Sequence, residues 1–411
     1  MALPGIELRW KHKVIAVTPQ ADGALVEVQT SDGNYTLHAD WLVVADGARS
    51  PIRRSLGLDV EGKVFQDRFL IADVVMKADF PAERWFWFDP PFHPGQSVLL
   101  HREADNVWRI DFQLGWDADP ELEKQPERVL PRIRAMLGSQ CDFELEWVSV
   151  YTFQCRRMHS FRHGRVLFAG DAAHQVSPFG ARGANSGIQD SDNLVWKLAL
   201  VIEGHAGEAL LDSYSAERGA AADENLLNST RSTDFMTPKS RAAKLLRDAV
   251  LSLAAEVPAG RALVNSGRLS VPSMLHGSPL NTPDAEAFEG WMVPGAPMDD
   301  APVQADSPWL LHQLGRGFTL LFFGKPDAAQ RAALDSLARG GVPVLPLLVL
   351  PPGESDELPA IEDTHGHVTR RFDGRRSTAY LIRPDQHVAA RWRALDAAAV
   401  CAALQRALAA A

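Results

Sequence analysis

The order of apolar and polar positions divides the chain into a strand-rich half, a helical region and a mixed tail. Short runs of alternating apolar residues, separated by Asp22–Gly23 and Asp32–Gly33, predict β-hairpins over residues 6–44. Further strand-like runs over residues 65–116 are rich in aromatic residues and predict a second sheet. A short helix is expected over residues 130–137, and residues 143–158 are expected to form two more strands.

Helical periodicity then dominates residues 185–264. Apolar residues recur at the spacing of one helix face at Ile188, Leu194, Val195, Leu198 and Val201. A stretch rich in proline and glycine over residues 272–308 follows, and after it the tail alternates strands and helices. The pattern therefore predicts an α/β protein with a separate C-terminal unit.

The composition excludes several classes of protein. The chain has 411 residues, of which 46% are hydrophobic and 23% charged, and this balance is typical of globular proteins rather than disordered ones. The net charge of -10 gives no support to nucleic-acid binding.

The cysteines and the apolar runs bear on where the protein works. Three cysteines without a C-x-x-C pair argue against a disulfide framework and against a zinc site, so we expect a reducing compartment and no metal. The most apolar run, residues 342–350, is too short to cross a bilayer. A cytoplasmic protein without membrane contact is expected.

The strongest chemical signal lies where a predicted strand ends at Asp171. An apolar run over residues 166–169 leads to Gly170 and Asp171, a loop rich in proline and glycine follows, and a helix begins near Asn185. A carboxylate in this position can accept hydrogen bonds from ribose hydroxyls, and a helix N-terminus favours negative charge on a bound ligand. A simple turn that ends the strand is the alternative.

A second signal occurs at residues 41–57, where a predicted buried strand ends in Asp46 and Gly47 with arginines close behind. A hairpin turn with a solvated basic face is the alternative interpretation. Because Asp46 and Asp171 both follow strands, the two carboxylates could converge on one extended nucleotide.

These two stretches resemble known fingerprints. Residues 43–53 (VVADGARSPIR) resemble the DG fingerprint, and residues 164–201 (GRVLFAGDAAHQVSPFGARGANSGIQDSDNLVWKLALV) resemble the GD fingerprint, of the class A flavoprotein monooxygenases, the aromatic hydroxylases of p-hydroxybenzoate hydroxylase type. Residues 210–220 (LLDSYSAERGA) resemble the usual continuation of that family. The tail is similar in element order to the thioredoxin-like C-terminal domain of the phenol hydroxylase and hydroxyphenylpropionate hydroxylase branches.

The resemblance implies an α/β fold with three parts: a partial FAD-binding fold of p-hydroxybenzoate hydroxylase type, an inserted β-sheet substrate domain and a C-terminal thioredoxin-like domain. The FAD-binding domain is expected at residues 1–60 and, with the helices, at 161–270. The substrate sheet is expected at 61–160. A linker is expected at 271–308, and the thioredoxin-like domain at 309–411, without a dithiol for redox exchange.

The resemblance also implies the ligands and their contacts. FAD is the expected cofactor, NAD(P)H the reducing co-substrate, and molecular oxygen and a small aromatic compound the substrates; a homodimer is one assembly that the family allows. Asp171 would contact the ribityl or ribose-pyrophosphate part of FAD, the backbone of residues 180–185 would hold the pyrimidine edge of the flavin, and Asp46 with Arg49 would line the groove between FAD and the nicotinamide. The expected cofactor-binding residues are Asp46, Gly47, Arg49, Gly170, Asp171, Ala172, Pro178, Gly180, Gly183, Ala184 and Asn185.

Less specific candidates surround the expected substrate pocket. The aromatic residues of 85–92 could form its wall, with core packing as the alternative for most of them. His101, Arg109 and His174 could orient a phenol or a carboxylate, or serve only the structure. No protein nucleophile is expected, because the flavin carries the chemistry.

One feature departs from the family. Its members begin with G-x-G-x-x-G, which seats the ADP pyrophosphate on a helix N-terminus, and this sequence contains no such motif. Gly315 and Gly317 come nearest, but they precede a predicted strand in the tail. We therefore expect part of the FAD-binding domain to be absent. Three functions stay open: an aromatic hydroxylase, a non-catalytic interaction module derived from one, and a flavin reductase or halogenase of the same fold.

Overall fold

The computed structural model describes residues 3–76, 80–138, 141–265 and 270–410. The first element is an antiparallel sheet in the order β1-β2-β3, built from β1 (Lys13–Pro19), β2 (Ala24–Thr30) and β3 (Gly33–Ala39). The two Asp-Gly pairs lie in or at its two turns, as predicted. Gly23 is required there, because a Cβ atom at this position would lie 2.3 Å from the carbonyl oxygen of Ala39.

A small sheet of three short strands joins two distant parts of the chain. β4 (Leu42–Val44) runs parallel to β11 (Val166–Phe168), which pairs with β10 (Arg162–His163) in an antiparallel hairpin. All three residues of β11 are fully buried, whereas Val43 of β4 is 44% exposed. The prediction of a buried strand at β4 is therefore wrong for Val43, because side chains alternate between the two faces of a strand and the face that carries Val43 is exposed, whereas Val44 is buried.

A six-stranded sheet in the order β12-β9-β5-β8-β7-β6 forms the middle of the molecule. Its strands are β5 (Glu61–Met76), β6 (Trp85–Phe88), β7 (Ser97–Arg102), β8 (Val107–Leu114), β9 (Phe143–Arg157) and β12 (His174–Gln175). Residues 143–157 form one long strand rather than two, because β9 pairs with β5 from Arg157 to Phe143.

The two faces of this sheet have different environments. One face packs on α3 (Pro126–Leu137), which follows the short helix α2 (Pro120–Glu123). Val129 and Ile133 of α3 are fully buried in that core, where each contributes roughly 1.5–3 kcal/mol. Side chains alternate along a strand, so the remaining residues of these strands point to the opposite face. On that face, Phe69, Phe86 and Phe153 lie near Phe179 of the loop before α4.

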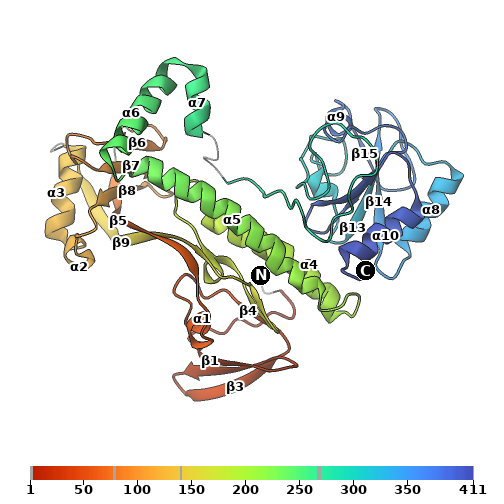
Figure 1. The fold of residues 1–411 in the computed structure, drawn as a ribbon, viewed down its shortest axis with the longest axis horizontal. Coiled ribbons are helices and arrows are strands. Elements are labelled where there is room, and N and C mark those ends of the chain that lie inside the picture. Colours follow the sequence, from red (N-terminus) through yellow and green to blue (C-terminus); the bar gives the residue numbers. More distant parts are fainter. Residues whose placement is uncertain (1–2, 77–79, 139–140, 266–269, 411) are drawn as a thin grey trace.

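Four helices follow in the region where helical periodicity predicts them: α4 (Gly183–Ile202), α5 (Leu210–Met236), α6 (Arg241–Glu256) and α7 (Pro258–Asn265). Figure 1 shows α4 and α5 side by side, with α5 reaching the six-stranded sheet at one end and both helices approaching the C-terminal unit at the other. These two helices therefore connect the two halves of the molecule.

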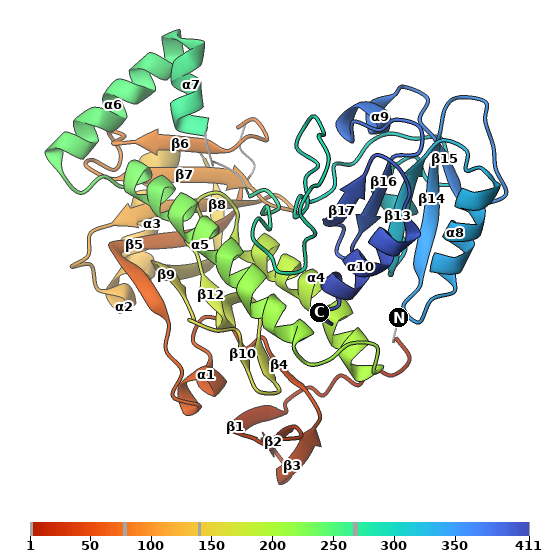
Figure 2. The ribbon, with the colours of Figure 1, turned by 45° about the vertical axis from the view of Figure 1, so that its right-hand side comes forward.

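The C-terminal unit contains a five-stranded sheet in the order β15-β14-β13-β16-β17. Its elements are β13 (Phe318–Phe323), α8 (Ala328–Ala338), β14 (Val344–Leu350), β15 (Ala360–Glu362), α9 (His367–Arg371), β16 (Ala379–Ile382), β17 (Val388–Trp392) and α10 (Ala397–Ala407). β15 and α9 are too short to stand out in the sequence pattern. α8 and α10 cover one face of the sheet (Figure 2).

The other face of this sheet is covered by α9 and by the irregular segment expected as a linker. Met292, Ala296 and Ala301 of that segment are fully buried against the sheet. Its backbone also bonds directly to the strand region, as in the hydrogen bond from Gly295 N to Val388 O at 2.7 Å. Residues 271–308 thus form a packed layer of the C-terminal unit although they contain no helix or long strand.

Membrane-spanning helices and metal-ligand clusters are both absent from the described residues. None of the helices there combines the length and the apolarity needed to span a membrane. In the same part of the chain, no three His, Cys, Asp or Glu side chains gather as ligands for a metal ion.

Candidate active site

The two loops singled out by the sequence meet at one edge of the small sheet. Because β4 and β11 are parallel neighbours, the loops after them, with Asp46 and Asp171, leave the sheet at the same edge. The buried guanidinium of Arg53 donates to the carbonyl oxygen of Ala172 at 2.6 Å and to that of Ala48 at 2.9 Å. Gln175 Nε2 donates to the same Ala48 carbonyl at 2.9 Å. The structure therefore brings the two motifs into one site.

A buried charge network holds the turn that follows β11. This turn is the short 3-10 helix η1 (Gly170–Ala172), which begins at a glycine with φ of 60°. The N–H of Gly170 donates to Asp190 Oδ2 at 2.9 Å, and the same carboxylate bonds to His174 at 2.6 Å and to Arg218 at 2.7 Å. Burial alone would raise the pKa of Asp190, but His174 and Arg218 outweigh it and hold the pKa below its ordinary value.

Helix α4 packs closely on this turn. A Cβ atom at Gly187 would lie 3.4 Å from the Cα atom of Gly170, so a side chain at Gly187 would press on the turn. His174, a candidate to orient the substrate, bonds to Asp190 through Nε2 and is almost inaccessible to solvent, while its Nδ1 atom has no partner among the described residues.

Asp171 itself faces outward. Its side chain is exposed, and no hydrogen bond or ion pair of that carboxylate is recorded among the described residues. Partial desolvation by its surroundings raises the pKa of Asp171, and the charge of His174 opposes this effect. A free carboxylate therefore stands at the mouth of the site.

The glycine-rich loop leads into the N-terminus of α4. Gly180 and Ala181 both have positive φ, 97° and 52°, and the Asn185 side chain donates to the carbonyl oxygen of Ala181 at 2.6 Å. No side chain caps the first turn of α4, so the N–H groups of residues 183–185 have no intrahelical acceptor. This helix end offers donors and a positive dipole to a ligand.

The DG loop has an internal hydrogen bond, and its side chains Asp46 and Arg49 are exposed. Asp46 accepts a hydrogen bond from the backbone N–H of Ile52 at 3.2 Å, in the first turn of α1 (Pro51–Ser55). Gly47 has a φ of 84°, which a glycine adopts without strain. Arg49 is exposed, and only its backbone carbonyl enters a recorded bond.

A small cavity lies between the six-stranded sheet and the glycine-rich loop. Its volume is about 20 Å³, and its lining includes Arg84, Phe86, Ser97, Asp111 and Phe179. Phe69 and Phe153 stack within the same lining at a ring-centroid distance of 4.4 Å. The site therefore joins an aromatic-walled cavity to the loop that precedes α4.

The other candidates near the expected pocket have separate partners. In the run over residues 85–92, Phe86 lines the cavity, whereas Trp85, Trp87 and Phe92 pack against the core on the α3 side. Arg109 forms a bidentate ion pair with Asp73, both bonds at 2.8 Å. His101 bonds to Glu103 at 3.0 Å.

Two family profiles and several curated hydroxylases match this chain. The profile of a family described as FAD binding domain matches residues 2–229, and that of the HcaD C-terminal domain matches residues 309–407. The 3-(3-hydroxy-phenyl)propionate/3-hydroxycinnamic acid hydroxylase of Mycobacterium sp. (strain KMS) is 30% identical over 94% of this chain and 68% of its own length. The hydroxylase of the same name from Mycolicibacterium smegmatis is 29% identical over 93% of this chain and 69% of its own length.

The chain belongs to the family of FAD-dependent aromatic hydroxylases. Solved structures agree with this assignment. The OxyS anhydrotetracycline hydroxylase from Streptomyces rimosus is 27% identical with a TM-score of 0.69, covering 98% of this chain and 76% of that one. The flavin-dependent monooxygenase PieE, solved with FAD and substrate, shares the fold with a TM-score of 0.80 at 24% identity, covering 97% of this chain and 75% of that one.

The residues at the α4 end of this hydroxylase fit the flavin part of FAD. The uncapped N-terminus of α4 suits the negative charge of a reduced flavin, and the free Asp171 carboxylate suits sugar or ribityl hydroxyls. The close approach of Gly170 and Gly187 leaves the turn without side chains that would block a planar ring.

Several residues that shape the site were not predicted from sequence. Arg53, Gln175, Asp190 and Arg218 connect the two loops or hold the η1 turn. One signal was available for Asp190, because it lies between Ile188 and Leu194 in a helix predicted from its apolar residues, where a buried carboxylate needs a partner. Arg218 gave no comparable signal, since its partner lies 28 positions away.

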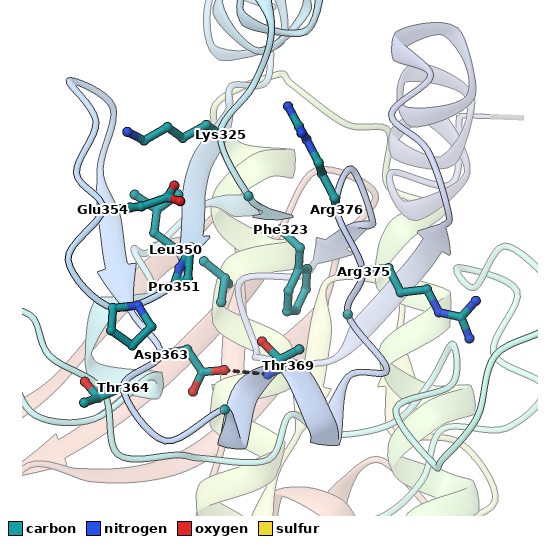
Figure 3. A pocket seen from close by; sticks show the side chains of 15 residues that line it. Phe323, Lys325, Leu350, Pro351, Glu354, Asp363, Thr364, Thr369, Arg375 and Arg376 are labelled. Carbon is teal, nitrogen blue, oxygen red and sulfur yellow. Dashed lines mark hydrogen bonds between the residues drawn. The ribbon is translucent and has the colours of Figure 1, made fainter.

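A larger cavity than the one beside the glycine-rich loop lies elsewhere in the described part of the chain. It has a volume of about 590 Å³ and is lined entirely by the C-terminal unit, at the ends of β13 and β14 (Figure 3). Asp363 at its base accepts from the N–H groups of Val368 and Thr369, so its charge is satisfied within the unit. None of the predicted cofactor-binding residues lines this cavity.

Proposed function

We propose that this hydroxylase uses FAD, NAD(P)H and molecular oxygen to add one hydroxyl group to a phenolic aromatic acid. The observation that carries the proposal is the aromatic-walled cavity directly beside the loop that leads to the uncapped N-terminus of α4. The substrate class comes from the relatives named for 3-(3-hydroxy-phenyl)propionate and 3-hydroxycinnamic acid.

The flavin would be held by the residues predicted from the fingerprints. Bound and reduced, FAD activates oxygen and delivers one oxygen atom to the aromatic ring. The N–H groups of residues 183–185 and the dipole of α4 would stabilise negative charge at the pyrimidine edge. Asp171 would accept hydrogen bonds from hydroxyls of the cofactor, and Asp46, which also accepts from the N–H of Ile52, would line the groove between FAD and the nicotinamide together with Arg49.

The cavity would hold the substrate ring. Phe69, Phe86, Phe153 and Phe179 provide an apolar wall that excludes water from the reacting atoms. The cavity of about 20 Å³ is smaller than an aromatic ring, so binding of the substrate would require a lining side chain such as Phe179 to change its rotamer. Arg84 at the cavity is exposed and suits the carboxylate of an aromatic acid.

The compartment follows from the cysteines. Cys141, Cys155 and Cys401 are all free thiols, as in proteins of reducing compartments, so we place the reaction in the cytoplasm. We further propose that residues 309–411 form a thioredoxin-like unit, on which residues 271–308 pack as an additional layer instead of a free linker.

The test is oxygen incorporation. The protein with FAD and NADH or NADPH is incubated with 3-(3-hydroxyphenyl)propionate under ¹⁸O₂, and the product is analysed by mass spectrometry. We expect faster NAD(P)H oxidation in the presence of the phenol and a product that carries one ¹⁸O atom. Oxidation without a labelled hydroxyl would indicate a reductase, and a halogenated product in the presence of halide would indicate a halogenase.

A further inference from the structure

Asp111 is a partly buried acidic residue in the wall of the small cavity. It lies on β8, where it pairs in register with Ile71 of β5 and Leu99 of β7. Its Oδ1 atom is inaccessible to water and has no hydrogen-bond partner among the described residues. Since a buried polar atom without a partner costs free energy, it indicates an interaction that forms with a ligand.

The other polar groups of this cavity are already engaged or exposed. The hydroxyl of Ser97 donates to Gln113 Oε1 at 2.6 Å. Arg84 is exposed at the surface of the site. Among the polar side chains that line this cavity, Asp111 is therefore distinguished by an inaccessible oxygen atom without a partner among the described residues.

The charged groups around Asp111 come from four neighbouring segments. Arg109 on β8 and Asp73 on β5 neutralise each other, and so do His101 and Glu103 at the end of β7 when the histidine is protonated. Arg84, which precedes β6, adds one positive charge. Burial raises the pKa of Asp111 to about 7, because it outweighs the attraction of Arg109 and Arg84.

We propose that Asp111 contacts the phenolic hydroxyl of the substrate and accepts its proton during hydroxylation. The O–H bond of the phenol breaks, a new O–H bond forms on the carboxylate, and the electron pair remains on the phenolic oxygen. This charge increases the electron density of the ring, which favours attack on an electrophilic oxygen. No further reactant is needed. The inference rests on the proposed function, because it assumes a phenolic substrate.

The position of Asp111 also orients the substrate. With the hydroxyl on Asp111 within the sheet and the carboxylate on the exposed Arg84, an aromatic acid would lie across the cavity between Phe86 and Phe153. A substrate without the hydroxyl would leave Oδ1 unpaired, so the site should discriminate against it.

The first test is equilibrium binding, which needs no catalysis. Asp111→Asn is compared with wild type and with the control Asp105→Asn, an exposed residue in the turn between β7 and β8. Binding of 3-hydroxycinnamate and of cinnamate is measured by isothermal titration calorimetry, and thermal melts confirm folding. We expect Asp111→Asn to weaken 3-hydroxycinnamate binding about tenfold at pH 8 and to leave cinnamate binding unchanged.

The second test is the pH dependence of turnover. The ionised form of Asp111 is the proton acceptor, so kcat in wild type should rise as the pH increases through about 7. In Asp111→Asn, kcat should fall about a hundredfold and lose this rise. A ring-fluorinated 3-hydroxycinnamate, whose hydroxyl ionises at lower pH, should recover part of the lost rate.

The outcomes separate the inference from the proposed function. Equal losses of affinity for both ligands, or an unchanged pH profile in Asp111→Asn, would assign a purely structural role to Asp111. If wild type binds the phenol through Asp111 but forms no hydroxylated product, the inference on binding holds and the proposed function fails.

Discussion

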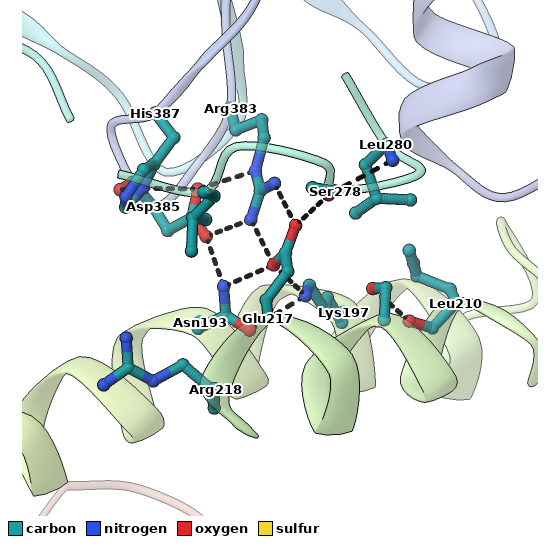
Figure 4. Close-up of polar contacts among 12 residues, drawn as sticks. Asn193, Lys197, Leu210, Glu217, Arg218, Ser278, Leu280, Arg383, Asp385 and His387 are labelled. Carbon is teal, nitrogen blue, oxygen red and sulfur yellow. Dashed lines mark hydrogen bonds and ion pairs between the residues drawn. The ribbon is translucent and has the colours of Figure 1, made fainter. Parts of the chain in front are cut away.

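Replacing Arg383 by methionine should destabilise this hydroxylase more than any surface change in the C-terminal unit. Arg383 is almost completely buried where the C-terminal unit meets α4 and α5 (Figure 4). Its guanidinium binds the Glu217 carboxylate at 2.6 and 2.9 Å and the Asp385 carboxylate at 2.9 and 2.6 Å. Lys197 completes the cluster with a bond of 2.7 Å to Glu217.

The expected magnitude follows from the charge balance of this cluster. Two cations, Arg383 and Lys197, neutralise two anions, Glu217 and Asp385, all of them buried. Burial alone would raise the pKa of Glu217 and of Asp385, but Arg383 and the other partners hold both well below their ordinary values. Methionine at position 383 leaves one buried negative charge uncompensated, which costs about 3–5 kcal/mol of unfolding free energy.

The assay is urea unfolding followed by circular dichroism at pH 7. Arg331→Met is the matched control, because Arg331 binds Asp356 with two contacts of 2.8 Å in the same unit but at the surface, where such pairs contribute little. Arg383→Met with Glu217→Gln restores the charge balance and should recover part of the loss. If Arg383→Met lowers stability no more than Arg331→Met does, the buried cluster does not stabilise the contact between the units.

Three further predictions concern the flavin site and the C-terminal unit. Asp171→Ala should raise the FAD dissociation constant about tenfold or more, because the variant loses an acceptor for cofactor hydroxyls; flavin fluorescence titration measures this, and unchanged affinity would exclude Asp171 from the site. Arg53→Met should lower the unfolding free energy by about 1–3 kcal/mol and weaken FAD binding, since the buried carbonyls of Ala172 and Ala48 lose their donor. The exposed neighbour Arg54→Met is its control, and equal effects of the two would contradict the role given to Arg53. Gly374→Ala should cost about 1–3 kcal/mol in thermal unfolding, because its Cβ atom would lie 2.2 Å from the Phe323 ring; an unchanged melting temperature would show that this ring moves freely.

The flavin loops could be predicted from the sequence because their chemistry is local. A strand, a carboxylate, glycines and a helix start follow one another within residues 166–185, so the order of residue types already describes the geometry. The meeting of this segment with residues 46–53 also followed, since two parallel strands place their ends at one edge. The hairpins at the Asp-Gly pairs were predicted for the same reason.

The cavity wall, the packing of residues 271–308 and the surroundings of Asp111 could not be predicted, because they depend on contacts between distant segments. The aromatic residues of 85–92 cannot be told apart in the sequence. Side chains alternate along β6, so Phe86 lines the cavity, whereas Trp85 and Trp87 pack against the core on the other face. Proline and glycine in residues 271–308 correctly indicated the absence of regular elements, yet they carry no information on packing, which buries Met292 completely. Asp111 gave no signal, because the property that distinguishes it is an Oδ1 atom without a hydrogen-bond partner among the described residues, and sequence does not show this.

Two polar networks along α4 and α5 link the flavin loop to the C-terminal unit. On α4, the carboxylate of Asp190 holds the η1 turn. Asn193 and Lys197 follow on the same helix face, three and seven positions further along. They bind the buried cluster that contains Glu217 and Asp385. On α5, two adjacent residues contact the two networks. Glu217 binds Arg383 of the C-terminal unit, and Arg218 binds Asp190 beside the η1 turn. Because buried charges tolerate little displacement without losing their partners, the two networks fix α4 along its length and against rotation. The C-terminal unit thereby supports the helix whose uncapped end lies at the proposed flavin site, although no residue of that unit lines the cavity beside it.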